Sequence, residues 1–263
     1  MPELPDVEIF RQHAEKHALN KKIESVDYED AQQVLKSSKQ LISRSLNGNV
    51  FTQTLRNGKH ILMKISNNKW LAMHFGMTGY LETSEKNKPK PKYTKLSVDF
   101  GNHRLNYISK RKLGALEITG SPAEYSKTHN LGKDALECSR DEFSRAFKNK
   151  RGGIKNALMD QSAVAGIGNI YSDEILFQEK IHPKQKIEKL TDKSFNSLFN
   201  TTKRVMKMAI KKDAQPSQLP ASYLLPNREE GRDCPRCGGS IKKIRVNGRG
   251  CFICPSCQTQ PGY

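Results

Sequence analysis

The sequence predicts a multidomain α+β protein in which an antiparallel β-sandwich or barrel precedes a helical region and a small metal-stapled hairpin. Three observations support this fold class. Apolar and polar residues alternate between Lys22 and Ile118, the helical period returns after about residue 130, and two Cys-x2-Cys pairs stand near the C-terminus. A chain of 263 residues is long enough for more than one folding unit.

The first element expected is a helix over residues 3–19, because apolar side chains recur there at helical spacing. They are Val7, Phe10, Ala14 and Ala18. Acidic residues in the first turn complement the positive end of the helix dipole.

The residue before this helix is Pro2. If Met1 is removed, Pro2 carries a secondary amine, a nucleophile that no other position of the chain can supply. If Met1 stays, the same nitrogen is an unreactive amide.

Short strands are expected over the next hundred residues, since Leu96, Val98 and Phe100 alternate with polar residues. Asn57-Gly58 and Asn67-Asn68 stand between apolar stretches and are typical of hairpin turns. Residues 85–92, EKNKPKPK, form a charged loop.

Helices return in the second half of the chain. Phe143 and Phe147 indicate one helix, and the spacing from Ile154 to Gln161 indicates another. The clearest apolar stripe covers residues 191–212, with Thr191 as the N-cap. Nine basic and two acidic residues lie from position 184 to 212, so the outer face of this helix is either merely solvated or contacts phosphate. Residues 213–231 contain three prolines and are expected to form a loop.

Four cysteines near the C-terminus predict one structural zinc ion. Their pattern is Cys-x2-Cys, sixteen residues, Cys-x2-Cys, which supplies the tetrahedral thiolate set that zinc prefers. We expect the ligands to be Cys234, Cys237, Cys254 and Cys257. A segment of about thirty residues cannot build a sufficient core of its own, so we expect a structural metal ion to stabilise it.

Two further cysteines and one arginine have open roles. Cys251 also forms a Cys-x2-Cys pair with Cys254, so it either faces the core or is a reactive spare thiol. The isolated Cys138 is expected to be buried. Between the zinc pairs, Asn247-Gly248 predicts a hairpin turn with Arg249 at its tip. There the arginine would either grip phosphate or remain solvated.

The composition indicates a polyanionic partner. Forty-five Lys and Arg against 27 Asp and Glu give a formal charge of +18. The apolar runs are shorter than a spanning helix needs, and the N-terminus has no secretory pattern. These observations favour nucleic acid over a membrane and predict an intracellular, cytoplasmic protein.

The stretch LMDQSAVAGIGNIYSDEILF, residues 158–177, predicts a helix, a glycine-rich turn and a second helix. Its two glycines do not match a dinucleotide-binding loop, because no strand precedes them and the third glycine is absent. Backbone N–H groups at the start of the second helix, beside the Asn169 amide, would form an anion site.

Together with PELPDVE at the start and the cysteine pairs at the end, this stretch resembles the Fpg/Nei family of DNA glycosylases, and within it the Fpg branch. The resemblance covers essentially the whole chain. It implies a catalytic β-sandwich domain over residues 1–128, a helix–two-turns–helix domain over 129–228 and a zinc finger over 229–263. It also implies a monomer that acts on double-stranded DNA with damaged bases or abasic sites, at the nucleoid.

The resemblance also assigns roles to individual residues. Pro2 matches the catalytic amine and Glu3 the acid/base carboxylate, while Asp6 stands where the family usually has glutamate and Lys59 matches a phosphate contact near the lesion. The residues that match the wedge filling the gap left by an extruded base are Met77, Arg111 and Leu113, of which Leu113 replaces the commoner aromatic residue. The residues that match phosphate contacts are Lys155, Asn169 and Arg249, and Glu174 matches a structural acidic residue.

The activity implied is removal of oxidised bases through a Schiff base on Pro2, followed by β,δ-elimination. The stretch PELP, residues 2–5, and Met77 favour oxidised purines such as 8-oxoguanine and formamidopyrimidines. Residues 213–227 depart from the usual purine-recognition segment, so a Nei-type preference for oxidised pyrimidines stays open. A non-catalytic zinc-containing nucleic-acid-binding protein is the alternative from a different class.

Overall fold

The computed structural model describes residues 1–259, and the chain forms two compact units. The first unit contains Met1–Pro2 and Asp6–Asn130. The second begins at Leu131 and also includes Glu3–Pro5. The predicted helical domain and zinc finger therefore fall in one unit.

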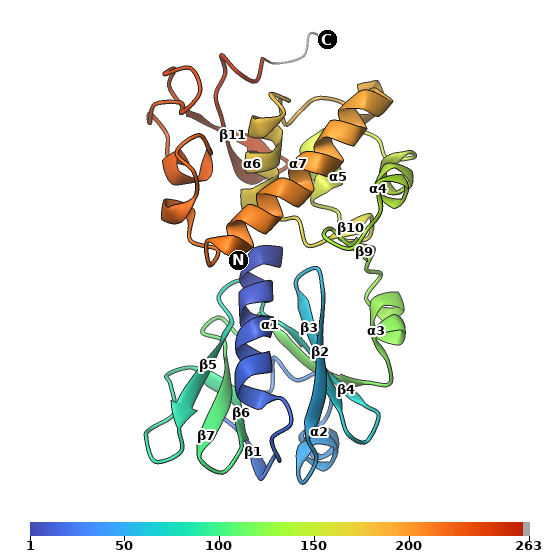
Figure 1. The fold of residues 1–263 in the computed structure, drawn as a ribbon, viewed down its shortest axis with the longest axis vertical. Helices are drawn as coiled ribbons and strands as arrows, with labels where there is room; N and C mark the ends of the chain where they lie inside the picture. Colours follow the sequence, from blue (N-terminus) through green and yellow to red (C-terminus); the bar gives the residue numbers. More distant parts are fainter. Residues whose placement is uncertain (260–263) are drawn as a thin grey trace. The chain divides into compact units, whose positions relative to one another are not determined.

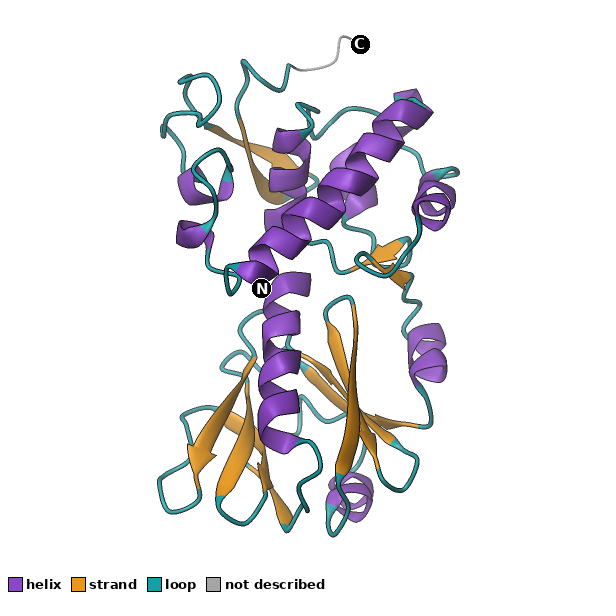
Figure 2. Ribbon diagram, in the orientation of Figure 1, coloured by secondary structure: helices purple, strands orange, loops and turns teal. Residues whose placement is uncertain are grey.

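The first unit is built from two four-stranded antiparallel sheets (Figure 2). One has the order β1 (Ser25–Tyr28), β6 (Thr94–Asp99), β7 (His103–Ile108), β5 (Tyr80–Glu85). The other has the order β2 (Phe51–Asn57), β3 (His60–Ile65), β4 (Trp70–His74), β8 (Ala115–Thr119). The helices are α1 (Leu4–Ala18), α2 (Lys39–Leu46) and α3 (Pro122–Thr128).

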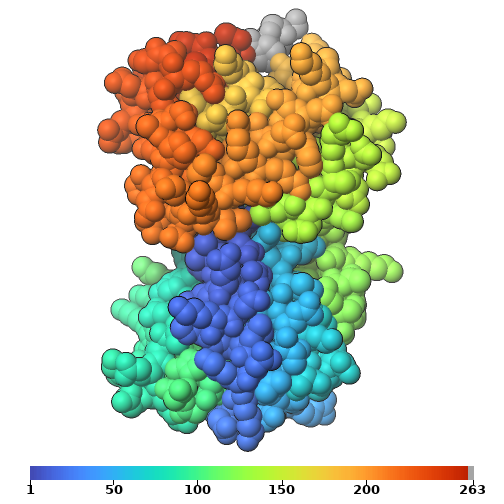
Figure 3. All heavy atoms as spheres, in the orientation of Figure 1, coloured from blue at the N-terminus to red at the C-terminus, as the bar shows by residue number. Residues whose placement is uncertain are grey.

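Apolar side chains of both sheets and of α1 form one core, which confirms the predicted β-sandwich. From α1 this core takes Val7, Ala14 and Ala18, three residues of the predicted stripe. The helix lies along the seam between the sheets (Figure 1). Its outward side chains form a strip on the surface, dark blue in Figure 3.

Two predicted hairpin turns are present. Asn57 pairs with His60 across β2 and β3, so Gly58 and Lys59 form a two-residue turn in which Gly58 has a φ of 59°. The second turn joins β3 to β4, and there Asn68 takes a φ of 64°. Glycine and asparagine tolerate this left-handed conformation best.

The second unit is mainly helical. Its helices are α4 (Arg140–Phe147), α5 (Ile154–Leu158), α6 (Asn169–Gln178) and α7 (Asp192–Lys211), with 3₁₀ turns η1 (Ile187–Lys189), η2 (Pro216–Gln218) and η3 (Leu225–Asn227). Two short strands, β9 (Lys133–Asp134) and β10 (Val164–Ala165), pair in parallel. The zinc hairpin is β11 (Lys242–Val246) and β12 (Arg249–Ile253).

Helix α7 follows its predicted pattern. The Thr191 side chain accepts a hydrogen bond from the Ser194 N–H, as an N-cap does. Leu198, Val205 and Met206 are buried in the core of the second unit. The outward side chains of α7 form a large part of the surface seen in Figure 3, in orange.

Helix α6 has no polar face. Seven consecutive residues, Tyr171–Phe177, are buried, and α7 and β12 both pack against the helix. The two acidic residues inside this run, Asp173 and Glu174, are therefore enclosed, and each must be satisfied by protein groups.

Two sequence-based assignments need correction. Helix α5 ends at Leu158, and Gln161 lies beyond it, where its side chain binds the backbone carbonyls of Met159 and Ile167. The segment 213–231 is not a plain loop, since it contains η2 and η3. Leu219, Tyr223, Leu224 and Leu225 are buried, which ties this segment to the second unit.

No helix among the described residues is long and apolar enough to cross a membrane.

Candidate active site and nucleic-acid interface

The N-terminal segment places a carboxylate on the first turn of α6. The two Glu3 carboxylate oxygens accept hydrogen bonds from the backbone N–H groups of Ile170, at 2.8 Å, and Tyr171, at 3.2 Å. The Leu4 N–H donates to the Gly166 carbonyl at 3.1 Å. Glu3 is 1% exposed, so its position is fixed by the helix terminus rather than by solvent.

Gly168 makes this approach possible. A β-carbon built on Gly168 would lie 2.2 Å from Cδ of Glu3, well inside van der Waals contact. The glycine-rich turn thus leaves room for the carboxylate, while the N–H groups of the helix terminus bind it.

The sequence predicted an anion site at this helix terminus, and the structure shows which anion two of its N–H groups bind. It is Glu3 of the same chain. Asn169 is turned toward the zinc hairpin, where its Nδ2 donates to the Gly250 carbonyl at 3.0 Å. Its buried Oδ1 has no hydrogen-bond partner in the described part of the chain.

Pro2 and Asp6 belong to the first unit. Pro2 is half-buried, Met1 is exposed, and Asp6 lies in the first turn of α1. Two residues further along, Glu8 is paired with Arg11 and Arg56. Burial tends to raise the pKa of Glu8, but hydrogen bonds from these two arginines outweigh burial and lower it.

Lys59 lies in the β2–β3 turn and is 6% exposed. The rings of His60 and His74 stack beside this turn at 4.6 Å, and His60 Nδ1 lies 3.0 Å from the Tyr125 hydroxyl. Burial, and then neighbouring charges, lower the pKa of His60 well below its usual value and that of His74 to about 4. Both rings are therefore neutral near pH 7.

The three predicted wedge residues lie on two loops that touch. Met77 follows Gly76 between β4 and β5, while Arg111 and Leu113 lie between β7 and β8. All three side chains are exposed. A β-carbon on Gly76 would lie 2.5 Å from the Leu113 carbonyl, so the glycine allows the two loops to approach closely.

Lys155 does not lie on the surface. It is completely buried, and its ammonium donates to the Asn169 carbonyl, the Ser172 hydroxyl and the Asp173 carboxylate at 2.9, 2.8 and 2.5 Å. In this conformation a phosphate cannot reach the ammonium directly, so Lys155 supports the first turns of α6.

Glu174 is also completely buried. It accepts hydrogen bonds from the Leu225 N–H at 2.8 Å and from the Gln178 side chain at 2.7 Å. Burial raises its pKa to about 7, against the opposing effect of these hydrogen bonds. Its contacts hold η3 against α6, in agreement with the structural role that the sequence suggested.

The four predicted zinc ligands form one cluster. The sulfur atoms of Cys234, Cys237, Cys254 and Cys257 all lie within 4.8 Å of one another. Four thiolates from two Cys-x2-Cys knuckles fit one tetrahedral structural zinc ion. The ion would join the two ends of the β11–β12 hairpin.

Cys251 is not a ligand. Its thiol is buried and donates to Asp173 Oδ1 at 2.9 Å. Burial, and then the neighbouring carboxylate, raise its pKa, so the thiol stays protonated and is not a reactive spare. Cys138 is buried, as expected.

The turn between β11 and β12 is the predicted Asn247-Gly248, with φ values of 46° and 76°. These values suit a hairpin turn of type I′. Arg249 follows the turn and is exposed, and one of its nitrogens lies 3.8 Å from the Met159 sulfur.

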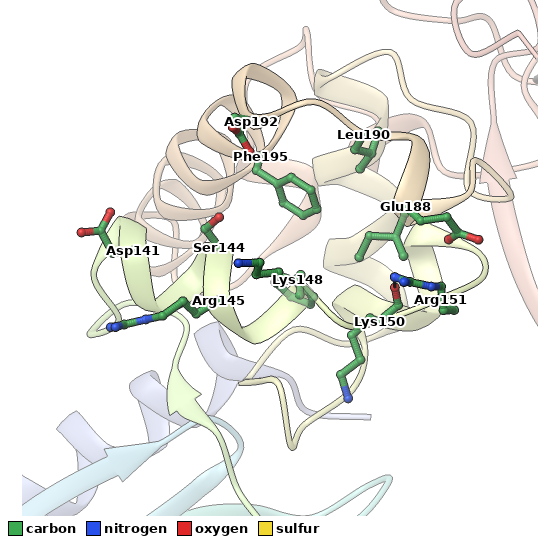
Figure 4. Close-up of a pocket in the computed structure, with 12 residues that line it drawn as sticks. Asp141, Ser144, Arg145, Lys148, Lys150, Arg151, Glu188, Leu190, Asp192 and Phe195 are labelled. Atoms are coloured by element: carbon green, nitrogen blue, oxygen red, sulfur yellow. Dashed lines mark hydrogen bonds between the residues drawn. The ribbon is translucent and has the colours of Figure 1, made fainter.

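A separate cleft of about 560 Å³ lies in the second unit (Figure 4). It is lined from α4, the following loop, η1 and the start of α7. Arg145, Lys148 and Arg151 face it together with Asp141 and Glu188, so its charge is mixed. None of the predicted site residues lines it.

Sequence reasoning missed Asp173, whose carboxylate binds Lys155, Arg228, the Cys251 thiol and the Phe252 N–H. One signal was available: an acidic residue four positions after Asn169, inside the apolar run of α6. A carboxylate in such a run must find buried partners, but the sequence does not say which.

Comparison with known proteins agrees with this architecture. The family profile for the formamidopyrimidine-DNA glycosylase N-terminal domain matches residues 1–116, and the profile for its H2TH domain matches residues 131–220. The profile for the zinc finger found in FPG and IleRS matches residues 233–260.

Relatives match over almost their whole length. Formamidopyrimidine-DNA glycosylase of Lactococcus lactis subsp. lactis is 32% identical, with 98% of this chain and 99% of the relative covered. That of Mycoplasma genitalium is 31% identical, with 98% and 96% covered. A solved Lactococcus lactis glycosylase bound to DNA with an AP site has a TM-score of 0.89 at 29% identity, with 98% of this chain and 100% of that chain covered.

These matches define the class of protein as a zinc-containing DNA glycosylase of base excision repair. The chain belongs to the formamidopyrimidine-DNA glycosylase family.

Proposed function

We propose that this protein is a bifunctional DNA glycosylase and AP lyase whose nucleophile is the Pro2 amine. The observation that carries the proposal is the Glu3 carboxylate, held by two backbone N–H groups of α6 and joined to Pro2 by one peptide bond. An acid/base group and an amine nucleophile are thereby linked in the chain. A protein that only binds DNA has no need of this pair.

The amine must be neutral to attack. An ordinary α-amine has a pKa of about 8, so about a tenth of it is free at pH 7. Pro2 nitrogen attacks C1′ of the damaged nucleotide, the bond from C1′ to the base breaks, and the base leaves with a proton. Glu3 supplies a proton to the sugar ring oxygen as the ring opens to the iminium.

The iminium acidifies the proton on C2′. Loss of that proton expels the 3′ phosphate, and a second elimination expels the 5′ phosphate. Water then releases the sugar fragment from Pro2. Asp6 and Lys59 are proposed to complete the catalytic group, Asp6 as a second carboxylate and Lys59 as a cation for the phosphate beside the lesion.

The reacting carbon is unreachable inside duplex DNA, so the nucleotide must rotate out of the stack at a cost of a few kcal/mol. Met77, Arg111 and Leu113 are proposed to occupy the gap. They are exposed on two loops that touch at Gly76, which suits a wedge.

The basic chain is proposed to hold the DNA backbone, with Arg249 at the hairpin tip and Asn169 as phosphate contacts and Lys155 as their buried support. With about six phosphates neutralised, affinity would fall about a thousandfold from 50 to 200 mM salt. The protein would act as a monomer on damaged duplex DNA, in the cytoplasm at the nucleoid.

The preferred lesion is proposed to be an oxidised purine. Solved relatives of the same fold are bound to DNA containing carbocyclic 8-oxo-G or Fapy-dG. Cleavage of duplexes with 8-oxoguanine, formamidopyrimidine or thymine glycol, each opposite several bases, tests the preference. Faster release of thymine glycol would assign the protein to the Nei-type alternative.

Borohydride trapping on an abasic-site duplex tests the chemistry. Protein without Met1 should form a covalent adduct, and mass spectrometry should place it on Pro2. Pro2→Gly or retention of Met1 should abolish this adduct, while Pro5→Ala serves as the matched control. An adduct on a lysine, or no adduct with any form of the protein, would contradict the proposed chemistry. The alternative of a non-catalytic zinc-containing DNA-binding protein would then remain.

A further inference from the structure

Asp173 is a buried carboxylate on which four other residues converge. One oxygen accepts from the Lys155 ammonium at 2.5 Å and the Cys251 thiol at 2.9 Å. The other accepts from the Arg228 guanidinium at 2.7 and 3.0 Å and from the Phe252 N–H at 3.2 Å. The side chain of Asp173 has no exposed surface.

These partners come from three separate parts of the second unit. Lys155 lies on α5, Arg228 follows η3, and Cys251 and Phe252 lie on β12 of the zinc hairpin. Asp173 lies in the second turn of α6, so this helix holds all three through one carboxylate. Burial of such a charge is tolerated only because its acceptor sites are filled and two cations face it.

The same helix binds the hairpin at a second point one turn earlier, where Asn169 donates to the Gly250 carbonyl at 3.0 Å. Lys155 connects the two points, because its ammonium binds both the Asn169 carbonyl and Asp173. The hairpin is therefore fixed to α6 at the three residues that follow Arg249.

We propose that Asp173 is a positioning residue for DNA binding, because it fixes the zinc hairpin on α6 so that Arg249 and Asn169 meet the DNA backbone in a set geometry. This inference rests on the proposed function, in which Arg249 contacts phosphate. Buried ion pairs contribute little net stability over apolar packing, so a role in geometry explains this one better than a role in stability alone.

Binding of a duplex with an abasic-site analogue, measured across a range of salt concentrations, tests the proposal. Asp173→Asn keeps the size of the side chain and removes its charge. Asp192→Asn makes the same charge change at an exposed carboxylate of α7 and is the matched control. A purely structural role would lower stability without removing a phosphate contact.

We expect Asp173→Asn to weaken binding about tenfold and to lower the salt slope by about 0.9, the value for one lost contact. Arg249→Ala should do the same. The double variant should bind no more weakly than Asp173→Asn alone, since that change already removes the Arg249 contact. An unchanged slope in Asp173→Asn, or additive losses in the double variant, would overturn the proposal.

A second pair of variants covers the case in which Asp173→Asn does not retain one zinc ion per chain. Cys251→Ala removes one donor and leaves both ion pairs, and Cys251→Ser restores a donor. We expect a weaker salt dependence for the alanine variant and recovery for serine. Wild-type binding by Cys251→Ala would then refute the role of Asp173. Borohydride trapping at a saturating protein concentration measures Schiff-base formation independently of affinity. Failure of the proposed function would therefore appear in the trapping experiment, and failure of the proposal for Asp173 in the binding measurements.

Discussion

Two carboxylates, one in each unit, are satisfied in opposite ways. In the first unit, Glu8 is charged and paired with Arg11 and Arg56, and its pKa is lowered. In the second, Glu174 is enclosed with backbone and amide donors, and its pKa is raised to about 7. A carboxylate with cationic partners stabilises its unit when ionised, whereas an enclosed one does so when protonated.

The units also differ in what sets their geometry. Strand register and an apolar core place Lys59 and the two loops of the proposed wedge in the first unit. In the second, polar contacts to α6 and the cysteine cluster place Glu3, Asn169 and Arg249. A single polar change should therefore disturb the second unit more than the first.

Removal of zinc should have the largest effect and should be confined to the second unit. Structural zinc contributes about 10 kcal/mol or more to the folding of small fingers, so a strong chelator should abolish DNA binding. The single tryptophan, Trp70 on β4, reports the first unit by its fluorescence. We expect its urea unfolding curve to stay unchanged, and a coincident loss would show that the units depend on each other.

Gly168→Ala should have the second-largest effect. Because the new β-carbon would overlap the Glu3 carboxylate, the proposed acid/base group would be displaced. Base release should then slow at least a hundredfold, a typical value for such a group. Glu3→Gln is the matched comparison. Single-turnover excision measures both, and wild-type excision by Gly168→Ala would exclude the role assigned to this contact.

Glu174→Gln should change how stability depends on pH. Between its ordinary value of 4.5 and its folded value of about 7, the folded state holds a proton that the unfolded state has lost. Rising pH should thus lower the free energy of unfolding of the wild type by about 3 kcal/mol over this window. Zinc release reports the urea unfolding of the second unit. The free energy of unfolding of the wild type should fall relative to that of Glu174→Gln as the pH rises. A constant difference between pH 4.5 and 7.5 would contradict the raised pKa.

Glu8→Gln should have the smallest effect and the opposite sign. The lowered pKa means that Glu8 contributes stability above its unfolded pKa and loses that contribution as the pH falls through its folded pKa. We expect a loss of about 1 kcal/mol at pH 7 that disappears in acid. Trp70 fluorescence during urea unfolding measures the loss. Glu24→Gln is the control, because Glu24 is exposed and its ion pair is with Lys22. Equal losses at pH 7 and in acid would refute the pairing.

Local patterns in the sequence predicted the elements with strong periodicity or definite turn chemistry. Helix α7 with its Thr191 cap, the Asn247-Gly248 turn and the four-cysteine cluster are all present. The failures have a common cause. Gln161 was assigned to a helix, and residues 213–231 to a loop, because periodicity does not record contacts with distant parts of the chain.

The sequence by itself determined the order of the sheets, helices and zinc cysteines, since spacing along the chain carries that information. The tertiary structure decided that Glu3 binds the N-terminus of α6, that Lys155 is buried and that Asp173 holds the zinc hairpin. Their partners lie many residues away, and only folding brings a carboxylate to the donors that allow its burial.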